Sequence, residues 1–259
     1  MRTLLTTLAI PLLFACNGDG SGKINLYTIE DDIELGRQLE AEIAADPVTY
    51  PVLSQTQYPE AYAHLYDIRD SILDSGAVFH ADDFDWELKI IHDDETLNAF
   101  CAPGGYIYVY TGLIKFLAHE DNLAGVIGHE IAHADLRHST QQLTQTFGLS
   151  VMLAILTDSD PGLLSEIAAS LINLSFSRSD EREADEASVD YLCNTPYAAD
   201  GTAGFFDQLE GFEVPEFLST HPSSDTRVED IIEYATLLEC DMTLNPDANY
   251  QALIDALPQ

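Results

Sequence analysis

The chain has 259 residues and a hydrophobic content of 46%, which is enough for a sizeable folded core and excludes a disordered protein. Its 10 Lys and Arg residues stand against 45 Asp and Glu residues, which gives a formal net charge of -35. A surface this acidic repels phosphate backbones and anionic membrane surfaces, so nucleic acid is not expected as a partner.

The first residues have the pattern of a secretory signal. Arg2 is followed by an apolar run from Leu4 to Phe14 and then by Ala15. The run is too short for a membrane-spanning helix, which needs about 20 apolar residues. A charged start, a short apolar core and a small residue before the cleavage point are typical of a signal peptide, which we expect over residues 1–15.

The cysteine that follows predicts a lipid anchor. Leu13-Phe14-Ala15-Cys16 resembles a bacterial lipobox, in which cleavage precedes the cysteine and its thiol receives diacylglycerol. Residues 16–26 would then form a lipidated, flexible tether. An Asp after the cysteine would favour retention at the inner membrane, but Asn17 stands there, so we expect an anchor in the outer membrane. The exported domain, residues 27–259, would then lie on the periplasmic side of that membrane. An ordinary signal peptide with an incidental Cys16 is the alternative.

The apolar spacing and the turn residues predict a helix-rich α+β domain. Helices are expected over 27–45 and 59–75, and a strand over 86–93. The stretch LNAFCAPGGYIYVYTGLI predicts a short strand, a turn at Pro103-Gly104-Gly105 and a strand over Tyr106–Tyr110. Further helices are predicted over 121–138, capped by Asp121, and over 140–157, 162–177, 179–194 and 223–239. Because composition does not shift along the chain, we expect one domain.

Export makes the cysteines informative, because disulfides form in oxidising compartments. Without Cys16 the domain retains Cys101, Cys193 and Cys240, which is an odd number. Cys193 with Cys240 is the preferred pair and leaves Cys101 free in a strand.

The segment GHEIAHADLRHS contains an H-E-x-x-H motif. On a helix, His129 and His133 lie four residues apart on one face, a spacing suited to two ligands of one Zn²⁺. Glu130 lies about 100° around the helix and can reach a metal-bound water without binding the metal. A polar helix end with solvated histidines is the alternative, but the surrounding helix is apolar, and buried histidines need partners.

Catalytic zinc generally has three protein ligands, so a third must come from elsewhere. His138 lies nine residues after His129 on nearly the opposite helix face, and we expect it on the surface at the helix end. Glu181 and Asp185 are four apart on a later predicted helix, so one can bind the metal while the other holds a ligand histidine. Glu183 is the competing ligand, and a solvated acidic helix is the alternative.

These segments resemble the M48 metallopeptidases. Residues 177–185, SRSDEREAD, are similar to the S-R-x-x-E-x-x-A-D motif that follows H-E-x-x-H in that family. The segment LNAFCAPGG is similar to its N-A-x-x-x-P-G-G block, and STHPSSDTR to its T-H-P-x-x-x-x-R block. The resemblance implies a single zincin-like metallopeptidase domain of the compact periplasmic lipoprotein type, because no spanning helices like those of the membrane-embedded branches are present.

The resemblance also implies an active site and a reaction. It makes Glu181 the third ligand of one Zn²⁺ per chain and Asp185 the residue that holds a ligand histidine from behind. It also places His221 and Arg227 in the active site. It implies a zinc-dependent endopeptidase of the bacterial envelope that cleaves unfolded or misassembled proteins, with Glu130 as general base on zinc-bound water. His221 or Arg227 would stabilise the oxyanion.

Two further hypotheses concern the ligand set and the substrate. His221 can instead close the metal site, which would make the protein an inactive or latent, zinc-stabilised chaperone-like or binding lipoprotein. The strand that begins Gly105, Tyr106, Ile107, Tyr108 is expected to accept a peptide substrate as an added β-strand, and its alternative is simple sheet core. The sequence leaves the oligomeric state open.

Overall fold

The computed structural model describes residues 24–156, 161–172, 175–209, 216–221, 226–245 and 249–258. The expected signal peptide, Cys16 and most of the expected tether lie outside these residues. Within the described ranges, no helix combines the length and the apolar character that crossing a bilayer requires.

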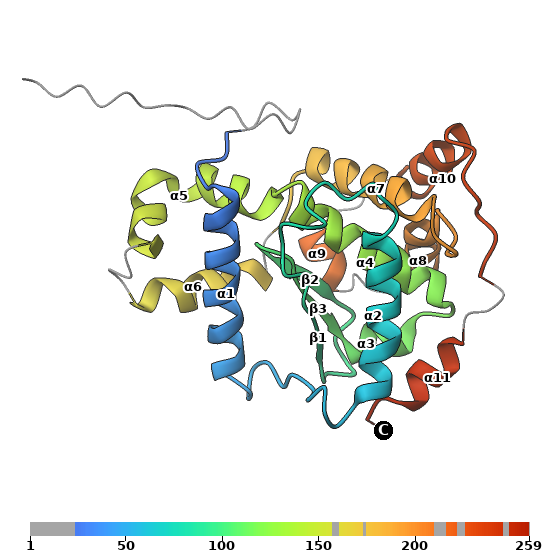
Figure 1. Cartoon of the computed structure of the whole chain (residues 1–259), viewed down its shortest axis with the longest axis horizontal. Coiled ribbons are helices and arrows are strands. Elements are labelled where there is room, and N and C mark those ends of the chain that lie inside the picture. The colour runs from blue at the N-terminus through green and yellow to red at the C-terminus, as the bar shows by residue number, and fades with distance from the viewer. Residues whose placement is uncertain are drawn as a thin grey trace, which may run out of the picture.

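A small mixed sheet lies at the centre of the fold (Figure 1). Its strands are β1 (Leu88–Ile91), β2 (Ala99–Ala102) and β3 (Tyr106–Tyr110), in the order β1-β3-β2. β3 runs parallel to β1 and antiparallel to β2. The tight β2–β3 turn uses Gly104 and Gly105, both in the left-handed region at φ 75° and 88°.

The helices surround this sheet and make the protein a helix-rich α+β fold. On one side lie α1 (Ile29–Ala45), α5 (His138–Leu156) and α6 (Pro161–Ile172), and on the other lie α2 (Pro59–Leu73) and α4 (Glu120–Asp135) (Figure 1). The helices α7 (Arg178–Leu192), α8 (Gly201–Leu209) and α10 (Arg227–Leu237) form a second layer beyond α4. Three short helices complete the described fold: α3 (Thr111–Phe116), α9 (Glu216–Thr220) and α11 (Tyr250–Asp255).

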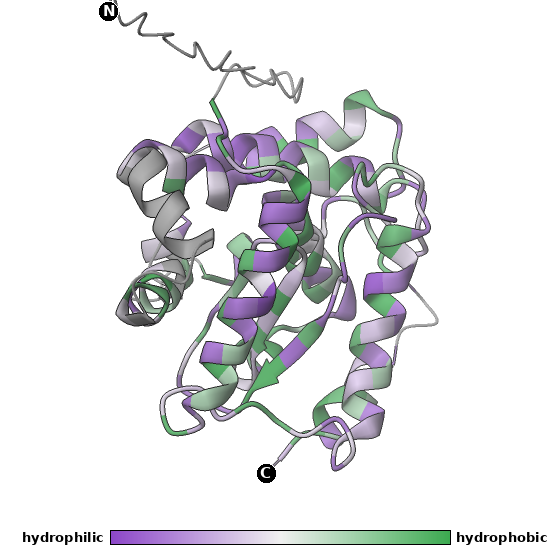
Figure 2. Cartoon of the chain, turned by 60° about the vertical axis from the view of Figure 1, so that its left-hand side comes forward, coloured by the Kyte–Doolittle hydropathy of each residue, from purple (hydrophilic) through white to green (hydrophobic). Residues whose placement is uncertain are grey.

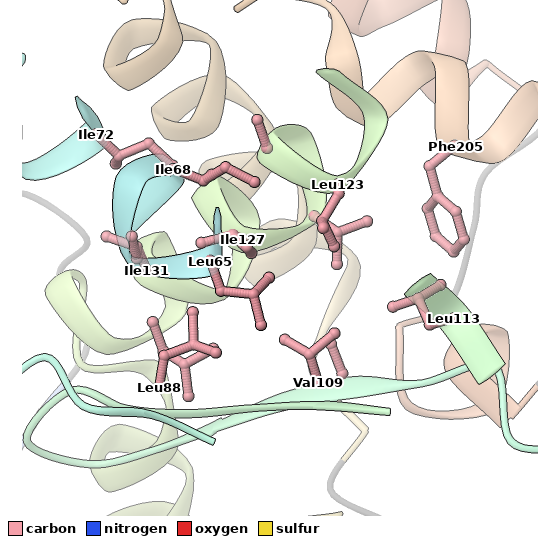
Figure 3. Close-up of a cluster of buried hydrophobic side chains, with 14 of the residues drawn as sticks. Leu65, Ile68, Ile72, Leu88, Val109, Leu113, Leu123, Ile127, Ile131 and Phe205 are labelled. Atoms are coloured by element: carbon pink, nitrogen blue, oxygen red, sulfur yellow. The ribbon is translucent and has the colours of Figure 1, made fainter. Parts of the chain in front are cut away.

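The sheet separates two apolar cores because successive strand side chains point to opposite faces. Ile107 and Val109 of β3 face the α2–α4 side, whereas the tyrosines of β3 face α1. In Figure 3, Leu65 and Ile68 of α2 meet Ile127 of α4 above the sheet. This packing buries α4 and makes it the fixed element on which a site can be built.

Local sequence explains where the outer helices begin. Thr28 caps α1 and Ser177 caps α7, each in a capping box with an aspartate three residues later. Pro59 occupies the first turn of α2, where its missing N–H costs nothing. Figure 2 shows hydrophilic and hydrophobic residues interspersed along the outer helices. The buried residues of α1 and α2 are mostly apolar, as in amphipathic helices.

The helix that carries the histidines begins and ends differently from its prediction. Asp121 is not its cap, because α4 starts after His119. Instead, Asp121 Oδ1 accepts hydrogen bonds from the backbone N–H groups of Ala198 and Asn245. The helix stops at Asp135 rather than 138, because the chain turns at Arg137, whose φ is 60°.

A disulfide joins Cys193, at the end of α7, to Cys240, which follows α10. Cys101 is free and buried in β2. This is the pairing preferred from the sequence, and it ties together two helices that both contribute to the site described below.

Gly125 lets α8 approach the backbone of α4, and its replacement provides a test of the packing. A Cβ on Gly125 would lie 2.1 Å from the backbone nitrogen of Thr202. We expect Gly125→Ala to lower the free energy of unfolding by about 3 kcal/mol, because the clash is with backbone and one helix must shift. In the control Gly204→Ala, the new Cβ meets only the Asn122 side chain, at 2.8 Å, and we expect a change within about 1 kcal/mol. Equal urea midpoints for the two variants would contradict this account.

Candidate metal centre

The middle of α4 presents His129, Glu130 and His133 inside the protein. Their exposed fractions are 0%, 1% and 0%. α7 packs against α4 and brings Glu181, which is 2% exposed, to the same place. The structure therefore brings together the three residues predicted to bind metal, and it buries them where an uncompensated charge would be costly.

The donor atoms of these residues converge. The Nε2 atoms of His129 and His133 are 3.0 Å apart, and Glu181 Oε1 lies 3.5 Å from His133 Nε2. Glu181 Oε2 lies 3.6 Å from His129 Nε2. Two ligands of a tetrahedral Zn²⁺ at 2.0–2.1 Å are about 3.3 Å apart, so the spacing and the donor types fit zinc.

His221 completes a four-residue group whose donor atoms all lie within 4.8 Å of one another. Its Nδ1 is 3.3 Å from His129 Nε2 and 3.1 Å from Glu181 Oε1, while its Nε2 is 3.5 Å from Glu130 Oε1. The ring is stacked on Phe217 of α9, with the centroids 4.3 Å apart. His221 therefore lies between the ligand atoms and Glu130.

Asp185 and Arg227 form a buried support behind the ligands. Asp185 Oδ1 is 2.9 Å from the Nδ1 atom of His129, and the Arg227 guanidinium forks onto both oxygens of Asp185. Arg227 Nη2 also lies 2.9 Å from Glu181 Oε2. Arg227 is thus engaged with both carboxylates, and its Nη2 also lies 3.4 Å from His129 Nε2.

The charged groups in this site shift one another's pKa values. Burial alone would lower the pKa of His129, but the Asp185 and Glu181 carboxylates outweigh it and raise that pKa to about 9. Burial would raise the pKa of Glu181, but His221, His129 and His133 hold it well below its usual range. The ligand carboxylate is therefore ionised at neutral pH, as a metal ligand must be.

One neighbouring residue, His138, lies elsewhere than expected. His138, expected on the surface at the helix end, is only 2% exposed, and its Nδ1 lies 2.9 Å from Nδ1 of His133. The prediction was wrong because it continued α4 through residue 138, whereas the turn at Arg137 returns His138 toward the site. Glu183, the competing ligand, is not part of the four-residue group: it accepts a hydrogen bond from Ser179, and its Oε2 lies 3.5 Å from His138 Nε2.

The strand predicted to bind substrate is not available for that role. β3 is the central strand: it pairs with β2 over Tyr106–Val109 and with β1 over Ile107–Tyr110, so it offers no free edge to a further strand. Gly105 is the turn residue before it and packs against Trp86. The sheet-core alternative holds for β3, and the site lies next to a different strand.

The sequence profile of Peptidase family M48 matches residues 42–235, which include every residue of this buried group. The chain belongs to peptidase family M48. The match covers well over half of the chain and includes the helix α4, the helix α7 and the segment with His221.

Several metalloproteases are similar to this M48 chain. It is 36% identical over 167 residues to the mitochondrial metalloendopeptidase OMA1 of Schizosaccharomyces pombe, which covers 61% of this chain and 49% of that protein. It is 30% identical over 167 residues to OMA1 of Arabidopsis thaliana, covering 63% and 34%. The metalloprotease YcaL of Escherichia coli is 28% identical over 145 residues, covering 52% and 57%. In each case the chain spans less than two thirds of the relative's own length.

Proposed function

We propose that this M48 chain is a zinc-dependent endopeptidase with one Zn²⁺ held by His129, His133 and Glu181. The observation that carries the proposal is the convergence of these three donors with Glu130 beside them. Bound there, zinc supplies a Lewis acid that polarises a peptide carbonyl and brings the pKa of water into the neutral range.

Glu130 is the residue placed to move the proton. Both of its carboxylate oxygens are buried and have no hydrogen-bond partner among the described residues. Burial raises the pKa of Glu130, which brings it closer to the working pH of a general base. The carboxylate takes a proton from the attacking water and passes it to the leaving amine. His221 Nε2, 3.5 Å from Glu130, is placed to donate to the developing oxyanion.

The substrate is proposed to bind along β2 rather than β3. The outer edge of β1 is occupied, since Leu53 N–H donates to Ile90 and His92 N–H donates to Pro51. In the described part of the chain, this leaves β2 as the sheet edge with no strand partner. β2 packs against α4, the helix that carries Glu130. A peptide added here would be held by main-chain hydrogen bonds with little sequence selectivity.

The setting is proposed from the first 26 residues. The signal-like run, the lipobox-like tetrapeptide and Cys16 support an exported lipoprotein tethered to the outer membrane on its periplasmic side. Its substrates would be unfolded or misassembled envelope proteins, because extended chains can pair with a strand edge. A free Cys16 thiol in the mass spectrum of the mature N-terminus would exclude the lipid anchor.

The proposed activity is tested by metal content and proteolysis together. The purified mature protein should contain about one zinc per chain and should digest unfolded casein. A chelator should stop the digestion, and added Zn²⁺ should restore it, because the ligands are preformed in the fold. Digestion that continues in metal-free protein would refute the proposal.

The deep burial of the site favours a second, latent form of the same function. His221 is 1% exposed and its Nδ1 belongs to the ligand group, so it can take the open position until a substrate or partner displaces it. If so, His221→Ala should raise casein cleavage several-fold. If His221 instead stabilises the oxyanion, the same variant should lose about 10²–10³-fold in kcat. Phe217→Leu removes the ring stacked on His221 but keeps the imidazole, so it is the matched control for a loosening of the segment around His221.

A further inference from the structure

His138 lies against the metal ligand His133 and is not used by the proposed reaction. It is the first residue of α5 and is buried. The turn that returns it is fixed by Arg137, whose guanidinium donates to Asp32 Oδ2 at 2.6 Å and to the carbonyl of Tyr27 at 2.5 Å. Residues far away in the sequence therefore hold His138 in place.

The contact between the two rings has a definite chemistry. The Nδ1 atoms of His133 and His138 are 2.9 Å apart, with the rings inclined at 70°. A neutral imidazole that binds metal through Nε2 carries its proton on Nδ1. In the proposed zinc site, His133 Nδ1–H must then donate, and His138 Nδ1 must accept.

This requirement fixes the tautomer of His138. A neutral His138 that accepts at Nδ1 carries its proton on Nε2. That atom faces Glu183 Oε2 at 3.5 Å and Asp180 Oδ1 at 3.9 Å. Asp180 is itself held by the Ser177 capping box, and the Glu183 side chain is 29% exposed and can rotate closer. In the structure His138 Nε2 is buried and makes no hydrogen bond to a described residue, and these two carboxylates are the acceptors near it.

We propose that His138 is a positioning residue that fixes the tautomer and orientation of His133 by accepting a hydrogen bond from His133 Nδ1–H at its own Nδ1. The Glu183 and Asp180 carboxylates, near His138 Nε2, favour the tautomer of His138 that can accept. Asp185 has the same role beside His129 Nδ1. Among the described residues, His133 Nδ1 has no other hydrogen-bond partner, and such partners strongly affect metal affinity.

The same three residues could also be considered as a second metal site, because His138, Asp180 and Glu183 offer donor atoms within 4.8 Å of one another. The tautomer argues against this. A cation on His138 Nε2 would leave the proton on His138 Nδ1, facing a His133 Nδ1 that also carries a proton while His133 binds zinc through Nε2. The two N–H groups, 2.9 Å apart, would repel each other.

The inference rests on the proposed zinc site, and a pair of amide variants tests it. Asn places its Oδ1 close to the position of histidine Nδ1, whereas Gln places its Oε1 close to that of Nε2. We expect His138→Asn to keep zinc affinity within about threefold of the wild type. His138→Gln and His138→Leu should each lose about 10–100-fold. Zinc affinity is measured by competition with a chromophoric chelator at pH 7.5, and circular dichroism of the metal-free proteins checks folding.

The outcomes distinguish the proposed support of His133 by His138, called the relay below, from the proposed zinc-dependent activity on which it rests. If the wild type binds no zinc, the proposed activity fails. If the wild type binds tightly and His138→Gln matches it, only the relay is wrong. Two zinc ions per wild-type chain, with the second lost in every His138 variant, would also overturn the relay in favour of a second metal site. His119→Leu, at the exposed start of α4, is the control and should leave zinc affinity unchanged.

Discussion

Glu130→Gln is expected to abolish casein cleavage, with a loss of at least about 10³-fold in kcat, while the protein still binds one zinc per chain. The amide has nearly the shape of the carboxylate but cannot take a proton at neutral pH, and general-base catalysis is worth about 10²–10⁴-fold. Because Glu130 does not lie among the metal-ligand donors, zinc affinity should change little. The measurement is initial cleavage rate on zinc-loaded protein, with metal content determined on the same sample.

A control is needed because Glu130 is buried and its replacement could loosen the core. Its carboxylate oxygens have no hydrogen-bond partner among the described residues, so the neutral amide should not lower the free energy of unfolding. Glu120→Gln, at the start of the same helix, changes a buried carboxylate that lies away from the ligands and should keep full activity. Full activity in Glu130→Gln would rule out the mechanism, whereas loss in both variants would indicate damage to α4.

The sequence predicted the parts of the site that depend on local spacing. Residues four apart on a helix must share a face, so the pairing of His129 with His133 followed from the spacing alone. The choice of Glu181 over Glu183 came from the family resemblance. The structure supports that choice because Glu181 Oε1 lies 3.5 Å from His133 Nε2, whereas Glu183 belongs to a separate group with His138 and Asp180.

The sequence failed where distant segments decide the outcome. The turn before His138 is held by Asp32 and Tyr27, which lie more than 100 residues earlier in the chain, so no local pattern could reveal it. The central position of β3 likewise depends on a parallel return to β1, which no turn sequence encodes. α8 begins at Gly201, where an added Cβ would lie 2.2 Å from the carbonyl oxygen of Asp121, and this close approach to α4 has no local sequence signal.

Glu181→Gln is expected to weaken zinc binding by more than about 100-fold, which exceeds the usual loss on removing an outer partner. The amide keeps the shape of the side chain but removes the charge that faces His129, His133 and Arg227. Breaking a buried charge group costs about 3–5 kcal/mol, so the metal-free variant should also unfold at lower urea concentration. Zinc competition and urea unfolding measure the two effects separately.

Two further variants on α7 test whether Glu181 is the metal ligand. Glu183→Gln changes only the carboxylate near His138 Nε2, an atom that His138→Asn lacks altogether, so its zinc affinity should fall by at most about threefold. Glu186→Gln, half-exposed one turn further along, should leave zinc binding unchanged. If Glu183→Gln lost zinc while Glu181→Gln kept it, Glu183 would be the ligand. The order Glu181, then Glu183, then Glu186 follows from their neighbours: Glu181 lies beside the paired histidines, Glu183 beside His138, and Glu186 beside Arg182. A uniform effect of reducing negative charge on α7 would not reproduce this order.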